Sequence, residues 1–182
     1  MSPYVSLAKI AVEKYIKEGK LIFPPKDLPQ ELFKEKSGVF VTIEKEIKSS
    51  PILRGCIGTY LPTRENIAQE IISNAIAAAT EDYRFNAIKE QELEKLSYTV
   101  SLLGRPEQIK DLKGLDPKKY GVIVKTFSAE EPHKTVKTGL LLPDLEGVDT
   151  IEKQISITCQ KAGINPKKEK IVIYRFTVKK YQ

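Results

Sequence analysis

Residues 53–58 read LRGCIG, so two glycines bracket Cys56 and Arg54 stands two positions before it. In an extended segment side chains alternate, which predicts Arg54 and Cys56 on one face, about 6–7 Å apart, and Leu53 and Ile57 on the core-facing side. A guanidinium near the sulfur favours the thiolate, the nucleophilic form of cysteine. It is also suited to two-pronged binding of a carboxylate or phosphate. Both uses need a partly open cleft.

Two other interpretations of the hexapeptide stand beside this one. Free cysteine is among the most buried residue types, so composition alone favours Cys56 as a small buried hydrophobe. Gly55 and Gly58 leave the backbone accessible or permit positive φ, which suits either a ligand or a turn needed only for folding. The glycine–arginine setting is what favours a functional thiol.

A second cluster of candidate residues is EDYRF, at residues 81–85. Asp82 and Arg84 form either an exposed ion pair or part of a cleft beside the hexapeptide. In the cleft interpretation Arg84 holds an anionic group, and aromatic side chains supply a wall. The alternative is a helix terminus pinned by an aromatic ring. The aromatic candidates are Tyr60, Tyr83 and Phe85.

Other chemistries find little support in the sequence. The chain has one histidine, His133 in AEEPHKT, which is more typical of a surface residue than of a catalytic base. With that histidine and two cysteines, Cys56 and Cys159, no Cys/His zinc pattern arises, and we expect no metal site. A disulfide between the two cysteines stays open. Phosphate-binding and dinucleotide-binding glycine motifs are absent.

The composition is that of a globular protein, with 41% hydrophobic and 30% charged residues and a formal net charge of +6. The basic stretches NPKKEK and TVKKYQ are more typical of solvated surface than of a nucleic-acid patch. No apolar run approaches the ~18–20 residues that span a bilayer, and the N-terminus lacks a signal-peptide pattern. We therefore expect a cytoplasmic protein without membrane association. Abundant Lys, Glu and Ile with few Cys and Met hint at a thermophilic source.

Periodicity defines the expected elements. Apolar residues recur at helical spacing over residues 3–18, and Gly19 suits the end of that helix. Thr63 is a good N-cap for an alanine-rich helix over residues 64–80. The remaining expectations are a proline-rich connector at 23–29, strands at 37–46, 52–60, 96–104, 122–127, 137–143 and 170–180, a short helix in IKEQELEKL, and a helix over 151–162 capped by Thr150 and ended at Gly163.

These elements predict an α+β fold with a mainly antiparallel or mixed sheet and about three helices, because extended segments outnumber helices after residue 96. The length of 182 residues is that of one domain or of two small lobes sharing a core.

The motifs together resemble a known family. LRGCIG, the alanine-rich helix, DYRF, LSYTVSLL, GVIV, TGLLLP and CQKAGI occur in the order found in the AMMECR family, whose hallmark is LRGCIG. The resemblance covers nearly the whole chain. It implies a single domain over residues 1–182, with a larger and a smaller lobe and a cleft near the hexapeptide. Carried over by position, it marks residues 53–58 with Arg84 and Phe85.

The resemblance also implies partner proteins, because in some microbes the domain accompanies a Memo-type domain and a radical S-adenosylmethionine protein. This association suggests a modification pathway. Two functions follow. The first is an enzyme or catalytic component, with Cys56 as nucleophile or covalent carrier and Arg54 beside it. The second is a non-catalytic binding module for an anionic ligand, nucleic acid or protein partner. The association with these proteins favours the first function, an enzyme or catalytic component. The expected ligand-binding residues are Gly55, Gly58, Tyr60 and Arg84. No substrate, cofactor or oligomeric state follows from the sequence.

Overall fold

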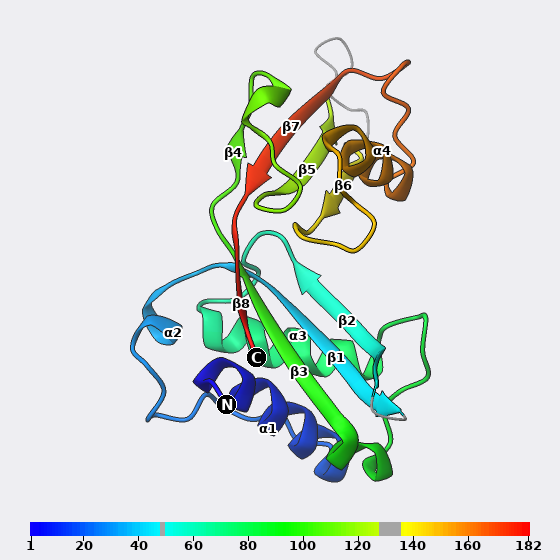
Figure 1. The fold of residues 1–182 in the computed structure, drawn as a ribbon. Helices are drawn as coiled ribbons and strands as arrows, with labels where there is room; N and C mark the ends of the chain where they lie inside the picture. The colour runs from blue at the N-terminus through cyan, green and yellow to red at the C-terminus, as the bar shows by residue number, and fades with distance from the viewer. Residues whose placement is uncertain (48–49, 128–135) are drawn as a thin grey trace. The chain divides into compact units, whose positions relative to one another are not determined.

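The structure is a computed structural model that describes residues 1–47, 50–127 and 136–182. The chain divides into two compact units (Figure 1). Unit 1 comprises Met1–Leu103 with Lys179–Gln182, and unit 2 comprises Gly104–Val178. The fold is α+β, as predicted, with two four-stranded sheets in which the described registers are antiparallel. The cleft expected between lobes stays a prediction.

Unit 1 is a four-stranded sheet with helices packed on it. Strand order is β2-β1-β3-β8, and α3 contacts β1, β2 and α1. The elements are α1 (Pro3–Glu18), α2 (Glu31–Lys34), β1 (Gly38–Ile47), β2 (Ser50–Thr59), α3 (Ile67–Thr80), the 3₁₀ helix η1 (Glu90–Lys95), β3 (Leu96–Leu103) and β8 (Val178–Tyr181). The short α2, directly after the proline-rich connector, was not predicted.

The helix ends show where local sequence decides structure. The side chain of Ser2 accepts a hydrogen bond from Val5 N–H at the start of α1, and Gly19 ends the helix with φ 65°. The predicted helix 3–18 is therefore confirmed. The predicted N-cap of α3 is wrong, because Asn66 caps that helix. Thr63 instead donates a hydrogen bond to Glu70, at 2.9 Å.

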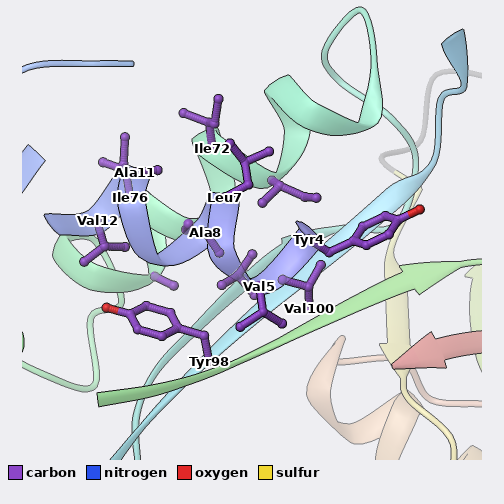
Figure 2. Close-up of a cluster of buried hydrophobic side chains, with 14 of the residues drawn as sticks. Tyr4, Val5, Leu7, Ala8, Ala11, Val12, Ile72, Ile76, Tyr98 and Val100 are labelled. Atoms are coloured by element: carbon purple, nitrogen blue, oxygen red, sulfur yellow. The ribbon is translucent and has the colours of Figure 1, made fainter. Parts of the chain in front are cut away.

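The core of unit 1 lies between the helices and one face of the sheet. Alternate residues of β1, Val39, Val41 and Ile43, are fully buried, which confirms the strand periodicity read from the sequence. Side chains of α1, α3 and β3 complete one apolar cluster, shown in Figure 2.

One buried hydroxyl in this cluster has no partner among the described residues. Tyr98 is 5% exposed, and no described residue hydrogen-bonds its hydroxyl. Burial raises the pKa of this phenol. We expect Tyr98→Phe to raise the free energy of unfolding by about 1 kcal/mol, since it removes an unpaired buried polar group. Urea denaturation measures this. The matched control is Tyr4→Phe, whose hydroxyl donates to Glu31; that change should lower stability, and equal losses in both variants would contradict the prediction.

Unit 2 is a smaller sheet covered by one helix. Strand order is β4-β7-β5-β6, and α4 contacts β5 and β6. Its core includes Val122, Leu141 and Val148. Thr150 caps α4 as predicted, by accepting a hydrogen bond from Lys153 N–H. The elements are β4 (Glu107–Gln108), the 3₁₀ helix η2 (Leu112–Gly114), β5 (Gly121–Thr126), β6 (Thr138–Leu141), α4 (Ile151–Lys161) and β7 (Ile171–Phe176).

The predicted single strand at 170–180 is wrong, because the segment forms two strands in different sheets. β7 pairs with β4 and β5, and β8 lies beside β3 (Figure 1). Thr177 separates them, and its carbonyl accepts a hydrogen bond from Gly104 N–H at 2.8 Å. The alternation of apolar side chains continues across Thr177, so the pattern carries no sign that the partner strands change. No helix among the described residues is long and apolar enough to cross a membrane.

Candidate functional site

Strand β2 contains a bulge at Arg54. Ile43 of β1 pairs with Gly55, but the next β1 residue, Glu44, pairs with Leu53. Arg54 is therefore an extra residue without a partner in the register. An extra residue transfers the residues beyond it to the other face of the sheet.

The bulge decides which side chains of the hexapeptide face the helices. Ile57 packs against the core of unit 1, as predicted. The same prediction is wrong for Leu53, which is 36% exposed because the extra residue moves it to the opposite face. Cys56 pairs with Thr42 and alternates with Ile57, so its side chain also lies on the face away from the helices.

The guanidinium of Arg54 is bonded to residues 86–92. Its Nε and Nη2 each donate to the carboxylate of Glu92 at 3.0 Å, and its Nη1 donates to the carbonyl of Asn86 at 2.8 Å. Lys45 donates to the same carboxylate at 2.8 Å. The Arg54 side chain is 15% exposed. Arg54 thus ties the segment 86–92 to β2, and its role at a substrate anion stays a prediction.

The outer edge of β2 at Cys56 is closed by Asp82 and Arg84. The Cys56 N–H donates to Asp82 Oδ2 at 2.8 Å, and Arg84 Nη2 lies 3.5 Å from the Cys56 carbonyl oxygen. The Arg84 guanidinium also donates twice to the Asp82 carboxylate, at 2.9 and 2.7 Å. An acceptor and a donor side chain therefore occupy the peptide groups that a neighbouring strand would use. This holds the backbone of Cys56 in place.

The Asp82–Arg84 pair is not the exposed pair that one interpretation predicted. Asp82 is 4% exposed, whereas the Arg84 side chain is 44% exposed. The ring of Phe85 lies 5.4 Å from the guanidinium carbon of Arg84 and 6.0 Å from that of Arg54, within reach of a cation–π interaction. Arg84 is the arginine of this group that also faces solvent.

The thiol of Cys56 is half-buried, and its sulfur lies 3.3 Å from Thr42 Oγ1, a hydrogen-bond distance with sulfur. The interpretation of Cys56 as a fully buried hydrophobe is therefore wrong. Cys159, in contrast, is buried in unit 2, and both cysteines are free thiols. Among the described residues no three His, Cys, Asp or Glu side chains are grouped as a metal site requires. His133 lies outside the described residues.

Both glycines of the hexapeptide are required by close approach rather than by positive φ. A Cβ on Gly55 would lie 2.0 Å from the carbonyl oxygen of Ala78 in α3, and a Cβ on Gly58 would lie 2.3 Å from the ring of Phe40. Neither glycine is among those with positive φ. They allow β2 to lie tightly against α3 on one side and against Phe40 on the other.

The two remaining aromatic candidates, Tyr83 and Tyr60, differ in exposure. Tyr83 is 95% exposed, and Tyr60 is half-buried at the end of β2. Their role as a wall beside the thiol stays a prediction. Because Tyr83 is almost fully exposed, its side chain does not pack against a neighbouring surface.

The two carboxylates around the hexapeptide are strongly acidic. The hydrogen bonds from Arg84 lower the pKa of Asp82 to about 2, against the opposing effect of burial. Those from Arg54 lower the pKa of Glu92 to about 2 in the same way. Both groups are therefore ionised at neutral pH and act as fixed acceptors, not as proton donors.

Sequence reasoning missed Glu92, Thr42 and Glu70. Thr42 is the register partner of Cys56, which a hairpin alignment of the two strands would reveal. Burial opposes ionisation of Glu70, yet hydrogen bonds from Thr59, Thr63 and Arg64 lower its pKa. Glu92 lies 38 positions from Arg54, and nothing in the local pattern connects the two.

Comparisons with known proteins show which sequences and which fold this chain resembles. The family model described as AMMECR1 matches residues 5–181. A protein of Thermotoga maritima is 49% identical over 180 residues, covering 99% of this chain and 97% of that protein. A protein of Clostridium acetobutylicum is 41% identical over 99% of this chain but only 36% of its own length. The crystal structure of the uncharacterised protein PH0010 from Pyrococcus horikoshii has a TM-score of 0.82 and 36% identity, covering 97% of this chain and 88% of that chain.

Proposed function

Because the chain belongs to the AMMECR1 family, we propose that it is a catalytic component of a modification pathway and that the thiol of Cys56 is its nucleophile or covalent carrier. The observation that carries this proposal is that the backbone of Cys56 is held in place. Its N–H is bonded to a nearly buried carboxylate, and the two flanking glycines fit strand β2 tightly to its neighbours. Cys56 is nevertheless not fully buried. A positioned nucleophile needs a fixed backbone and a sulfur that a substrate reaches, and in this proposal the half-buried Cys56 meets both needs.

Arg84 and Arg54 have different roles in this proposal. Arg84 contacts the anionic part of a substrate, because its guanidinium is 44% exposed and lies beside the Cys56 carbonyl. Arg54 positions the site by holding residues 86–92 against β2. Gly58 and Tyr60 complete the ligand-binding surface, whereas Gly55 is buried and contributes by letting β2 pack against α3.

Partners of the kind implied by the resemblance, Memo-type and radical S-adenosylmethionine proteins, are part of the proposal. The Clostridium relative supports the idea of a component, because this chain matches 36% of that protein and the rest of its length lies outside the match.

Alkylation tests the central residue. We expect iodoacetamide to modify Cys56 in the folded protein at least about tenfold faster than Cys159, since Cys159 is 2% exposed and serves as an internal control. Mass spectrometry of the cysteine peptides gives both rates. Equal protection of the two thiols would refute an accessible nucleophile.

The charge of the reagent tests Arg84. The ratio of the iodoacetate rate to the iodoacetamide rate reports positive charge near the sulfur, because only iodoacetate is an anion. Arg84→Ala should lower this ratio about threefold or more. Arg64→Ala is the matched control, since Arg64 also belongs to unit 1 but bonds to Ser73. An unchanged ratio in Arg84→Ala removes Arg84 from the proposal.

A non-catalytic binding module for an anionic ligand, nucleic acid or protein partner is the second candidate. The exposed guanidinium of Arg84 favours it, and the described residues offer the thiol no histidine as a base. Cys56→Ser separates the two functions, because a module keeps its binding whereas a thiol-dependent component loses its activity. Nucleic-acid binding would also weaken steeply with salt.

A further inference from the structure

The second feature with a ligand-binding geometry lies in unit 2, at the outer edge of β7. Strand β4 pairs with this edge over only two residues, Glu107 with Arg175 and Gln108 with Tyr174. One further hydrogen bond follows, from Ile109 N–H to the Ile173 carbonyl at 3.0 Å. Beyond it the described chain gives the edge no further strand partner.

The peptide groups of Ile171 point to this open edge. The carbonyl of Lys170 accepts a hydrogen bond from Phe127 N–H, on the side of β5. Peptide groups alternate along a strand, so those of Ile171 point the other way, as the Ile173 carbonyl does. An unpaired strand edge with free N–H and C=O groups is a template for a further strand.

A groove of about 230 Å³ runs along the same edge. Five of its eight lining residues are apolar, and one of these, Leu112, is 43% exposed. Three residues of β7 form one side, and the segment that diverges from β4 forms the other. The lining residues are Gln108, Ile109, Lys110, Asp111, Leu112, Ile171, Val172 and Ile173.

The charge at the groove is positive. Lys110 lines it and Lys170 directly precedes Ile171, and both lysines are exposed. The one acidic residue in the lining is Asp111, and its carboxylate accepts a hydrogen bond from Lys113 N–H at 2.9 Å. In the adjoining segments Lys113, Lys167 and Lys168 add exposed positive charge. The acidic residues there, Glu107 and Glu169, are paired with Arg175 at 3.2 Å and with Lys137 at 2.9 Å. The complementary ligand is therefore acidic.

We propose that an extended peptide segment in which acidic and apolar residues alternate binds here as an added strand on β7. Its backbone pairs with the outward N–H and C=O of Ile171, beyond the point where Ile109 is bonded to Ile173. Its apolar side chains enter the groove, and its carboxylates face Lys110 and Lys170. A peptide is favoured over nucleic acid because the free groups are strand-edge peptide groups, which bases and phosphates do not match in spacing. The site is independent of the function proposed for Cys56.

Peptide N-methylation tests the strand pairing without altering the protein. The probe is fluorescein-labelled Glu-Val-Glu-Val-Glu-Val-Glu, and its binding is followed by fluorescence anisotropy. N-methylation at one alternate set of residues should weaken binding at least about tenfold, and at the other set by less than about twofold, because only one set faces β7. Absence of binding by the unmethylated probe overturns the proposal. So does equal binding by both methylated peptides, which would indicate a site for polyanions in general.

Protein variants test the location. Ile171→Pro removes only an outward N–H at the first residue of β7, where proline is tolerated, and should abolish probe binding with an unchanged circular dichroism spectrum. Lys110→Glu should weaken binding about tenfold, whereas Lys180→Glu, an exposed lysine outside unit 2, should not. Binding that survives both Ile171→Pro and Lys110→Glu places the peptide elsewhere. Sedimentation showing a dimer that Ile171→Pro dissolves would assign the edge to a second copy of the chain and overturn the proposal.

Discussion

Gly55→Ala is expected to lower the free energy of unfolding of unit 1 by about 3 kcal/mol or more. The added methyl carbon would lie 2.0 Å from the carbonyl oxygen of Ala78 and 3.1 Å from its carbonyl carbon. Both are backbone atoms of α3, so no side-chain rotation relieves the overlap, and β2 must separate from the helix. Urea denaturation followed by circular dichroism gives the change in stability.

Gly19→Ala is the matched control for this variant. Gly19 also belongs to unit 1, but a Cβ there meets no atom within 4 Å, and the cost comes only from its φ of 65°. That cost is about 1 kcal/mol. If the two variants lose the same stability, the close approach of β2 to α3 is not what requires Gly55.

The same substitution bears on the site next to it. Gly55 and Cys56 are adjacent, and Asp82 follows α3 by two residues, so a displacement of β2 from α3 would also stretch the 2.8 Å bond from Cys56 N–H to Asp82. The packing of the hexapeptide and the position of its thiol therefore depend on one contact. A folding role and a functional role for the hexapeptide are compatible.

The sequence predicted those parts of the fold that depend on local periodicity. α1 repeats its apolar residues at helical spacing up to Gly19, and β1 alternates over Val39, Val41 and Ile43. The α+β class followed from such segments, because each periodic stretch requires an apolar surface to cover it. The hexapeptide was found by its residue types alone.

The arrangement of the site depends on interactions that local patterns do not contain. One extra residue, Arg54, changes the face of Leu53, and alternation assumes that no residue is extra. The partner of Arg54 is Glu92, in η1, and the burial of Asp82 depends on β2 meeting the end of α3. Charged residues usually remain exposed, so the sequence favours the solvated interpretation until the tertiary contacts are known.

Acid is expected to remove about 4 kcal/mol or more of stability from unit 1 between pH 5 and pH 2, because two of its carboxylates have pKa values of about 2 when folded. In the unfolded chain such groups titrate near pH 4. The unfolded state therefore binds protons first as the pH falls. The stabilisation is complete above about pH 5 and is lost as the pH falls through 4 towards 2.

Amide variants assign this loss to Asp82 and Glu92. Glu92→Gln should cost about 2–3 kcal/mol at pH 7, where it breaks the pairs with Arg54 and Lys45, and much less at pH 3, where part of that stabilisation is already lost. Asp82→Asn should behave alike through Arg84 and Cys56. Glu94→Gln is the control, because Glu94 is exposed in the same 3₁₀ helix as Glu92. Urea denaturation at both pH values gives the differences. A cost of Glu92→Gln that is as large at pH 3 as at pH 7 would mean that this carboxylate contributes through shape and not through charge.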